Sequence, residues 1–171
     1  MSDEAIDTFN VDGLEQLLKA LHVRPPVARV GILGGKDTRQ APERAGWVSK
    51  EIESAPPTNS EIGAAHEFGS PARGLPQRSF LRMPIGNNLQ KELERSGLLT
   101  QEVFDEVIKT GTVIPWMKKV AICAEACVSD AFDNGGPGWP AWKSSSYSNN
   151  AGQLLVDTKQ LRESITSEVG S

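Results

Sequence analysis

The chain has 171 residues, a hydrophobic fraction of 38% and a formal net charge of −4 at pH 7. This length is typical of one domain with or without extended arms, and we expect residues 1–171 to form a single domain. A net negative charge argues against a protein that coats DNA, because phosphate neutralisation needs a basic surface.

We expect a soluble protein that is cytoplasmic when made. No apolar run in the sequence approaches the roughly 18 residues of a membrane span. The first residues, MSDEAID, lack the basic and apolar regions of a signal peptide.

The first part of the chain predicts one helix, one strand and a long arm. Residues 9–21 carry an apolar stripe at helical spacing, and the Pro-Pro pair that follows ends this helix. Residues 27–33 (VARVGIL) have the composition of a short strand. Residues 34–58 show no sustained period, and we predict an arm that meets a neighbouring subunit. Within the arm, residues 46–52 can pair as a strand that Trp47 anchors.

A rigid corner is predicted next. Capping residues at positions 58–60 precede a short helix, which Gly69 ends. The glycines and prolines of residues 71–76 then force a turn. Residues 78–82 (RSFLR) predict a strand with Phe80 in the core.

The second half of the chain is mainly helical. Three helices are predicted, over residues 85–97, 100–109 and 115–132. Cys123 and Cys127 lie four residues apart in the last of these, and we interpret them as small apolar side chains on a buried face. Residues 135–153 predict a turn-rich loop. The alternating residues 165–169 (ITSEV) predict a terminal strand.

No group of residues in the sequence points to an active site, a metal site or a cofactor. His66-Glu67 is reminiscent of a metalloprotease motif, but Ser70 stands where the second histidine would be. The two histidines and two cysteines do not have the spacing of zinc ligands. We interpret His66 and Glu67 as residues that make local contacts at a helix end, and the alternative is an acid–base pair.

A local basic patch consists of Arg73, Arg78 and Arg82. It can be a solvated strand edge, an interface with an acidic neighbour or a nucleic-acid contact, and arginine beside aromatic residues is typical of interfaces. Trp139 and Trp142 either cover the domain's own core or insert into the next subunit. The predicted interface residues are Trp47, Arg73, Arg78, Arg82, Trp139 and Trp142.

Two separated stretches carry paired motifs. The first is residues 65–69 (AHEFG) followed by residues 75–82 (LPQRSFLR), and the second is residues 139–142 (WPAW) followed by residues 155–165 (LVDTKQLRESI). In this order they resemble the virion-morphogenesis and tail-completion family, the small neck proteins that join head and tail in tailed phages. The chain departs from the family pattern at Ser79, where proline is usual, and at Lys159, where glycine is usual.

The resemblance implies an α+β fold in which a small antiparallel β-sheet packs against helices, with extended loops or arms. It implies a structural protein of the virion, a neck or tail-terminator ring, expected to be a hexamer, at the head–tail junction or tail end. A ring needs heterologous contacts, in which one patch binds a different patch on the next copy. Such a protein is in the host cytoplasm during assembly.

The partners that the resemblance implies are other copies of the chain, head-connector or adaptor proteins, the tail-tube protein and, in a contractile tail, the sheath. DNA is expected only as passing cargo, and no membrane, cofactor or catalytic activity is expected. Two alternatives are open: a small phage-encoded enzyme that uses His66 and Glu67, and a nucleic-acid-binding module that uses the three arginines.

Overall fold

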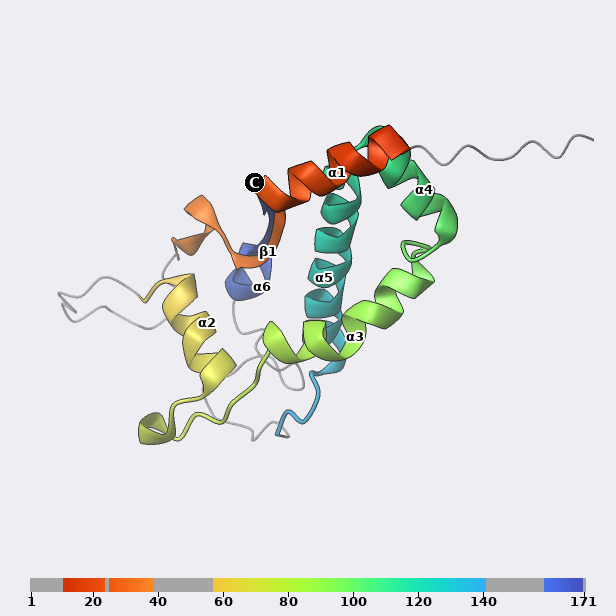
Figure 1. Ribbon diagram of the computed structural model, residues 1–171. Helices are drawn as coiled ribbons and strands as arrows, with labels where there is room; N and C mark the ends of the chain where they lie inside the picture. The colour runs from red at the N-terminus through yellow and green to blue at the C-terminus, as the bar shows by residue number, and fades with distance from the viewer. Residues whose placement is uncertain (1–10, 24, 39–56, 141–158, 171) are drawn as a thin grey trace, which may run out of the picture.

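The computed structural model describes residues 11–23, 25–38, 57–140 and 159–170, which Figure 1 shows in colour. These residues form the α+β fold expected from the sequence. The helices are α1 (Val11–Val23), α2 (Asn59–Phe68), α3 (Arg82–Arg95), α4 (Gln101–Thr110), α5 (Ile114–Asn134) and α6 (Gln160–Ser164). The strands are β1 (Val27–Ile32) and β2 (Ile165–Gly170), and two short 3-10 turns are η1 (Gly34–Asp37) and η2 (Pro71–Arg73).

The two strands pair antiparallel and bring distant parts of the chain together. Val27 lies opposite Gly170, and Ile32 lies opposite Ile165. A two-stranded sheet alone is marginally stable in water, and the long helix α5 contacts both strands. The predictions of a strand at residues 27–33 and of a terminal strand at residues 165–169 are confirmed to within one residue.

Helix α2 begins and ends where the sequence predicts. Thr58 Oγ1 accepts a hydrogen bond from the backbone N–H of Glu61 at 3.2 Å, and Glu61 Oε2 accepts one from the backbone N–H of Thr58 at 2.8 Å. This reciprocal pair is a capping box, which satisfies two donors at the helix start. Gly69 ends the helix with φ 76°, and a Cβ there would lie 2.9 Å from the backbone nitrogen of Gln77. Only glycine fits this position without strain.

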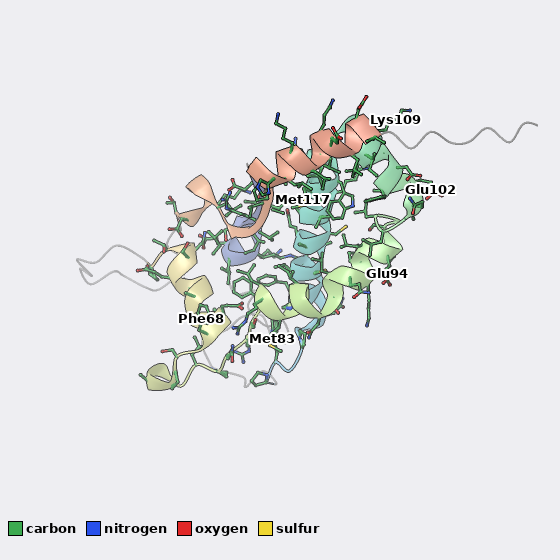
Figure 2. All side chains as sticks on the ribbon, viewed as in Figure 1. Phe68, Met83, Glu94, Glu102, Lys109 and Met117 are labelled. Atoms are coloured by element: carbon green, nitrogen blue, oxygen red, sulfur yellow. The ribbon has the colours of Figure 1, made fainter. Side chains whose placement is uncertain are left out.

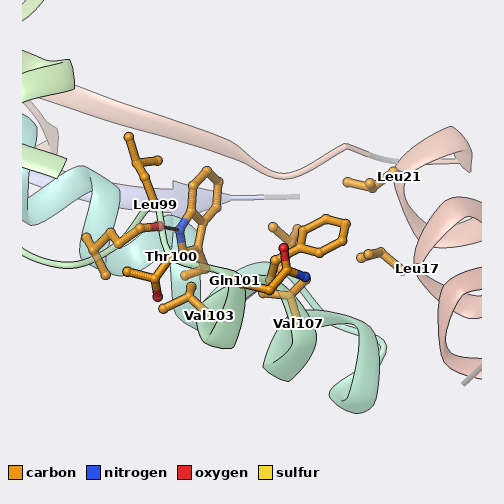
Figure 3. A pocket seen from close by; sticks show the side chains of 11 residues that line it. Leu17, Leu21, Leu99, Thr100, Gln101, Val103 and Val107 are labelled. Atoms are coloured by element: carbon orange, nitrogen blue, oxygen red, sulfur yellow. Dashed lines mark hydrogen bonds between the residues drawn. The ribbon is translucent and has the colours of Figure 1, made fainter. Parts of the chain in front are cut away.

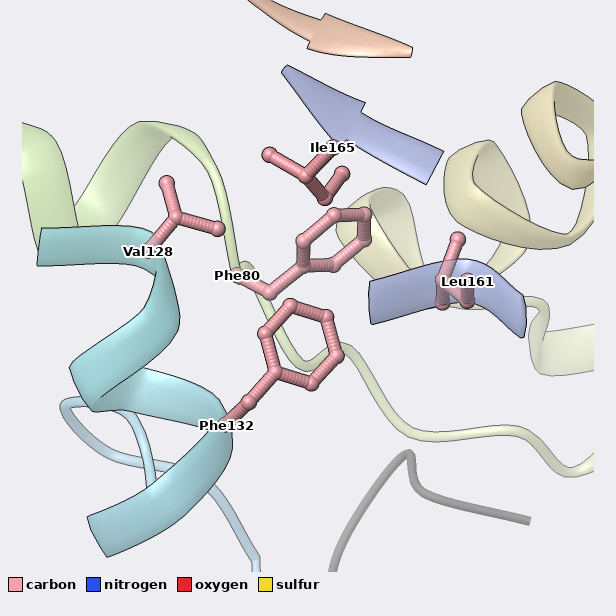
Figure 4. Packing of buried hydrophobic residues seen from close by; sticks show 5 residues of the cluster. All are labelled: Phe80, Val128, Phe132, Leu161 and Ile165. Carbon is pink, nitrogen blue, oxygen red and sulfur yellow. The ribbon is translucent and has the colours of Figure 1, made fainter. Parts of the chain in front are cut away.

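The main core lies where α2, α5, α6 and β2 meet (Figure 4). Its buried members are Phe80, Val128, Phe132, Leu161 and Ile165. The Phe80 and Phe132 rings are 5.4 Å apart between centroids and tilted by 53°, an arrangement that aromatic pairs favour. Phe80 has no exposed surface, which confirms its predicted place in the core.

The predicted strand at residues 78–82 is wrong. Residues 78–81 form neither strand nor helix, and helix α3 begins at Arg82, three residues before the predicted start at residue 85. The isolated β-bridge at the corner joins Ser70 and Leu75, before this segment. The early start has a tertiary cause, since the donors that open α3 are satisfied by a side chain from α2.

Helices α3 and α5 pack on each other around a second cluster, with Leu93, Leu98 and Cys123 buried. Cys123 and Cys127 are both free and buried, as expected of small apolar side chains. Burial is the largest cause that raises the pKa of the Cys127 thiol above its ordinary value of 9.0. Trp116 packs against this cluster, and its indole N–H donates a hydrogen bond to the Leu98 carbonyl at 2.9 Å.

Lys159 adopts the left-handed conformation that glycine would adopt at this position, with φ 60° and ψ −15°. The turn therefore forms without glycine, at a steric cost to the lysine backbone. Arg162 then attaches α6 to α5 through hydrogen bonds of 2.5 and 2.7 Å to the two carboxylate oxygens of Asp133.

Most of the predicted arm (34–58), including its possible strand (46–52), lies outside the described residues, as does most of the predicted loop (135–153). Residues 34–37 form η1. Among the described helices, none has both the length and the apolar composition that a bilayer-spanning helix needs.

Candidate functional site

A buried carboxylate, that of Glu67, lies at the start of α3. Glu67 is the penultimate residue of α2 and only 6% of its surface is exposed. Its Oε1 accepts hydrogen bonds from Ser79 Oγ at 2.6 Å and from the Arg82 backbone N–H at 3.2 Å, and its Oε2 accepts one from the Leu81 backbone N–H at 3.0 Å. The first turn of α3 holds no acidic residue of its own, so Glu67 supplies the negative charge that the start of a helix favours.

Ser79, which stands where the family that the sequence resembles usually has proline, extends this cap. Its hydroxyl donates to Glu67 and accepts a hydrogen bond from the Met83 backbone N–H at 3.1 Å. Proline could neither donate nor accept through its side chain. The serine therefore satisfies a third N–H of the opening turn of α3 while it is itself 1% exposed.

The connection between α2 and α3 is hydrogen-bonded along its length. Ser70 and Leu75 exchange backbone hydrogen bonds at 2.9 and 3.0 Å, and the Arg78 backbone N–H donates to the His66 carbonyl at 2.8 Å. The corner predicted from the glycine and proline pattern is thus fixed at both ends by backbone and side-chain contacts.

The geometry gives Glu67 a structural task. A general base needs a carboxylate oxygen that faces the proton it removes, within hydrogen-bond reach of substrate. Both oxygens of Glu67 instead accept from donors of the chain itself, and the carboxylate is buried. In the described parts of the chain, no group of three or more His, Cys, Asp or Glu side chains is placed to hold a metal ion.

The three arginines of the predicted basic patch lie in different environments. Arg78 is 6% exposed, and burial lowers the pKa of its guanidinium below its ordinary value. It therefore does not belong to the exposed surface that we expected to meet a neighbour or nucleic acid. Arg82 is on the surface, with 67% of its side chain exposed. The backbone of Arg73 lies in η2, and its side chain is outside the description.

Trp139 covers the domain's own core. Its ring packs on the cluster around Phe80, and its indole N–H donates to the Ser79 carbonyl at 3.2 Å. The first of the two interpretations therefore applies to Trp139. Trp47 and Trp142, the other predicted interface tryptophans, lie outside the described residues.

Sequence reasoning missed an exposed apolar surface at the corner. Phe68, the last residue of α2, is 67% exposed, and the Cζ of Arg82 lies 6.0 Å from the centroid of its ring. Met83, next in α3, is 38% exposed. We call Phe68, Arg82 and Met83 the Phe68 surface. No periodicity distinguishes Phe68 from a core residue, because its exposure depends on which helices pack beside it.

A second feature that the sequence did not reveal is an apolar groove between α1 and α4 (Figure 3). Its volume is about 460 Å³. The α1/α4 groove is lined by Leu17, Leu21, Leu98, Leu99, Thr100, Gln101, Val103, Phe104, Val107, Val113 and Trp116. The amphipathic patterns of α1 and α4 predicted buried stripes, and the two helices cover each other only in part: Leu21 of α1 and Phe104 of α4 are 36% and 54% exposed.

Comparison of the chain with models of protein families, with curated proteins and with solved structures found no match.

Proposed function

We propose that the chain is a structural virion protein of a tailed phage, a neck or tail-terminator (tail-completion) protein. It forms a homo-oligomeric ring, a hexamer, which joins the tail to the head connector. Its partners are its own copies, the connector or adaptor proteins, the tail-tube protein and, where the tail is contractile, the sheath. It has no catalytic role, and DNA passes it as cargo.

The observation that carries this proposal is that the paired motifs share one core. Phe80 comes from the first motif, and Leu161 and Ile165 come from the second, about eighty positions later in the chain. Trp139, from the loop that opens the second motif, packs on the same cluster. Residues that share a core are constrained by the fold as a set, which supports a family resemblance that rests on the two motifs together.

The corner supports a structural role in a second way. Glu67 and Ser79, the polar residues of the first motif with the closest contacts, hold α2 against the start of α3. Glu67 and Ser79 use their hydrogen-bonding capacity within the chain, as buried polar groups with a structural role do. The exposed residues nearby, Phe68, Arg82 and Met83, are of types that are enriched in protein interfaces.

The proposal is tested by assembly. Native mass spectrometry and light scattering on the purified chain give the number of copies, and negative-stain imaging shows whether the particles are rings. In parallel, virions made without the chain are examined for joined heads and tails, and complementation with the intact gene serves as the control. We expect ring-shaped oligomers, the chain in the virion, and unjoined or incomplete tails in its absence. A strict monomer that also fails to enter virions would refute the proposal.

A further inference from the structure

We infer that the Phe68 surface of one copy binds in the α1/α4 groove of a second copy, with Arg82 of the first reaching Asp105 of the second. The inference rests on the proposed function in that it supplies the contact from which a ring is built. It goes further in naming both faces of that contact.

The Phe68 surface is exposed and held in place. Phe68 is 67% exposed, a high value for a large apolar side chain, and Arg82 extends over its ring. The backbone on both sides is fixed, since Glu67 at the end of α2 accepts from the backbone N–H groups of Leu81 and Arg82. A preorganised aromatic–arginine surface loses little conformational freedom on binding, which favours affinity.

The α1/α4 groove has the size and lining to receive it. Its volume of about 460 Å³ lies in the range of pockets that enclose a ligand. The groove is therefore large enough for an aromatic ring with an adjacent side chain. Leucine, valine and aromatic residues make up most of its wall. The one indole N–H in the wall, that of Trp116, already donates to the Leu98 carbonyl, so an apolar occupant leaves no buried donor of that ring unsatisfied.

Charge complementarity favours a second copy as the occupant. Gln101 lines the groove and donates to the carboxylate of exposed Asp105 at 2.8 Å, which places this carboxylate next to the groove wall. Helix α4 as a whole has three carboxylates, Glu102, Asp105 and Glu106, and one lysine, Lys109. The Phe68 surface presents Arg82, whose Nε lies 4.0 Å from Glu67 Oε1 in its own chain and whose side chain is 67% exposed, which leaves the outer part of the guanidinium open to an anion. A cation beside an apolar ring thus meets an apolar groove beside an anion.

The two faces lie at different ends of the molecule. Figure 2 shows Phe68 and Met83 at one end and Glu102 and Lys109 of α4 at the other. A contact between different patches on identical chains is heterologous: each copy that is added presents a new groove or a new Phe68 surface. Such a contact builds a closed ring when its rotation closes, and this is the geometry that the proposed function needs.

Charge reversal on the groove side provides the first test, with the full-length chain and sedimentation analysis over a range of concentrations. Asp105→Lys should weaken self-association at least tenfold, because it places a cation against Arg82. Adding Arg82→Glu to Asp105→Lys should restore association to within a few-fold of wild type. Glu94→Lys, a reversal at another exposed carboxylate, is the matched control and should leave association unchanged. Thermal melting of each variant verifies that it is folded.

The apolar half of the contact is tested by Phe68→Ser, which should also weaken association at least tenfold. Ile122→Ser is its matched control, since Ile122 on α5 is 62% exposed and lies outside both faces. If the groove binds a different partner instead of a second copy, neither Asp105→Lys nor Phe68→Ser should weaken self-association.

Three outcomes would overturn the inference. Oligomers can form that neither Asp105→Lys nor Phe68→Ser weakens, or adding Arg82→Glu to Asp105→Lys can fail to restore self-association. The third outcome is a wild-type chain that stays monomeric at about 1 mM. None of these refutes the proposed function, which is decided by incorporation into virions and by the head–tail joining defect. If the chain self-associates through these two faces but never enters virions, the inferred contact stands and the proposed function is refuted.

Discussion

Replacing Glu67 by alanine removes the acceptor that opens α3. The variant leaves the Ser79 hydroxyl and the backbone N–H groups of Leu81 and Arg82 without their partner. An unsatisfied buried donor costs about 1–3 kcal/mol, and the lost charge at the helix start costs about 0.3–2 kcal/mol more.

These costs are not additive, and they are offset in two ways. Water can reach the two partly buried N–H groups, and the desolvation cost of burying the carboxylate is recovered. We therefore expect the free energy of unfolding to fall by about 3 kcal/mol, which is a melting-temperature decrease of about 6–12 °C for a chain of this size. Glu67→Gln keeps one acceptor oxygen but turns an amide towards the donors, and should cost roughly half as much.

The assay is urea unfolding followed by circular dichroism, with the midpoint and the slope fitted separately. Glu94→Ala is the control, because Glu94 is an exposed carboxylate on α3, the helix that Glu67 caps, and it should change stability by less than about 0.5 kcal/mol. If Glu67→Ala were as stable as Glu94→Ala, Glu67 would not cap α3, and the structural explanation of the first motif would be wrong.

Three further predictions concern stability, each measured by thermal or urea unfolding. Phe80→Ala should cost about 3–5 kcal/mol and leave little soluble protein, since Phe80 is fully buried; melting like wild type would remove it from the core. Lys159→Gly should raise the free energy of unfolding by about 0.5–1 kcal/mol, because glycine adopts the left-handed φ of 60° without strain; a lower value would show that the lysine makes compensating contacts. Asp37→Asn should destabilise the protein at neutral pH: the Asp37 carboxylate accepts from the Ser60 backbone N–H at 2.7 Å, which lowers its pKa below 3.8. A carboxylate with a depressed pKa stabilises the fold above its ordinary pKa and loses that contribution as pH falls through the lowered value, so the difference between variant and wild type should shrink below pH 3.8; a constant difference would contradict it.

The positions of helices and strands followed from local patterns. Thr58 and Glu61 form the capping box that their types and spacing favour, and Gly69 and Gly111 end α2 and α4 in backbone conformations that suit glycine. The burial of Phe80 was also predictable, from an apolar pair flanked by arginines. The caps and the glycine conformations act within a few residues in the chain, whereas Phe80 is buried by distant residues of α5, α6 and β2.

The corner shows where local patterns fail. Residues 78–82 (RSFLR) combine apolar and basic residues and contain no β-branched residue. We interpreted them as a strand, but α3 begins at Arg82 instead. The deciding contact is the carboxylate of Glu67, which comes from another helix. Likewise, Arg78 resembles a surface residue by type, yet the packing of the chain buries it.

The sequence by itself determined most of the described helices and both strands, because caps, glycine conformations and apolar periodicity act over a few residues. It also indicated the α+β class and the core role of Phe80. Only the tertiary structure decided which residues form a surface. Phe68 and the leucines of α1 have the same apolar character as core residues, and their exposure depends on which helix faces meet and how completely they cover each other. The Phe68 surface and the α1/α4 groove are therefore products of packing, which no single segment of the sequence encodes.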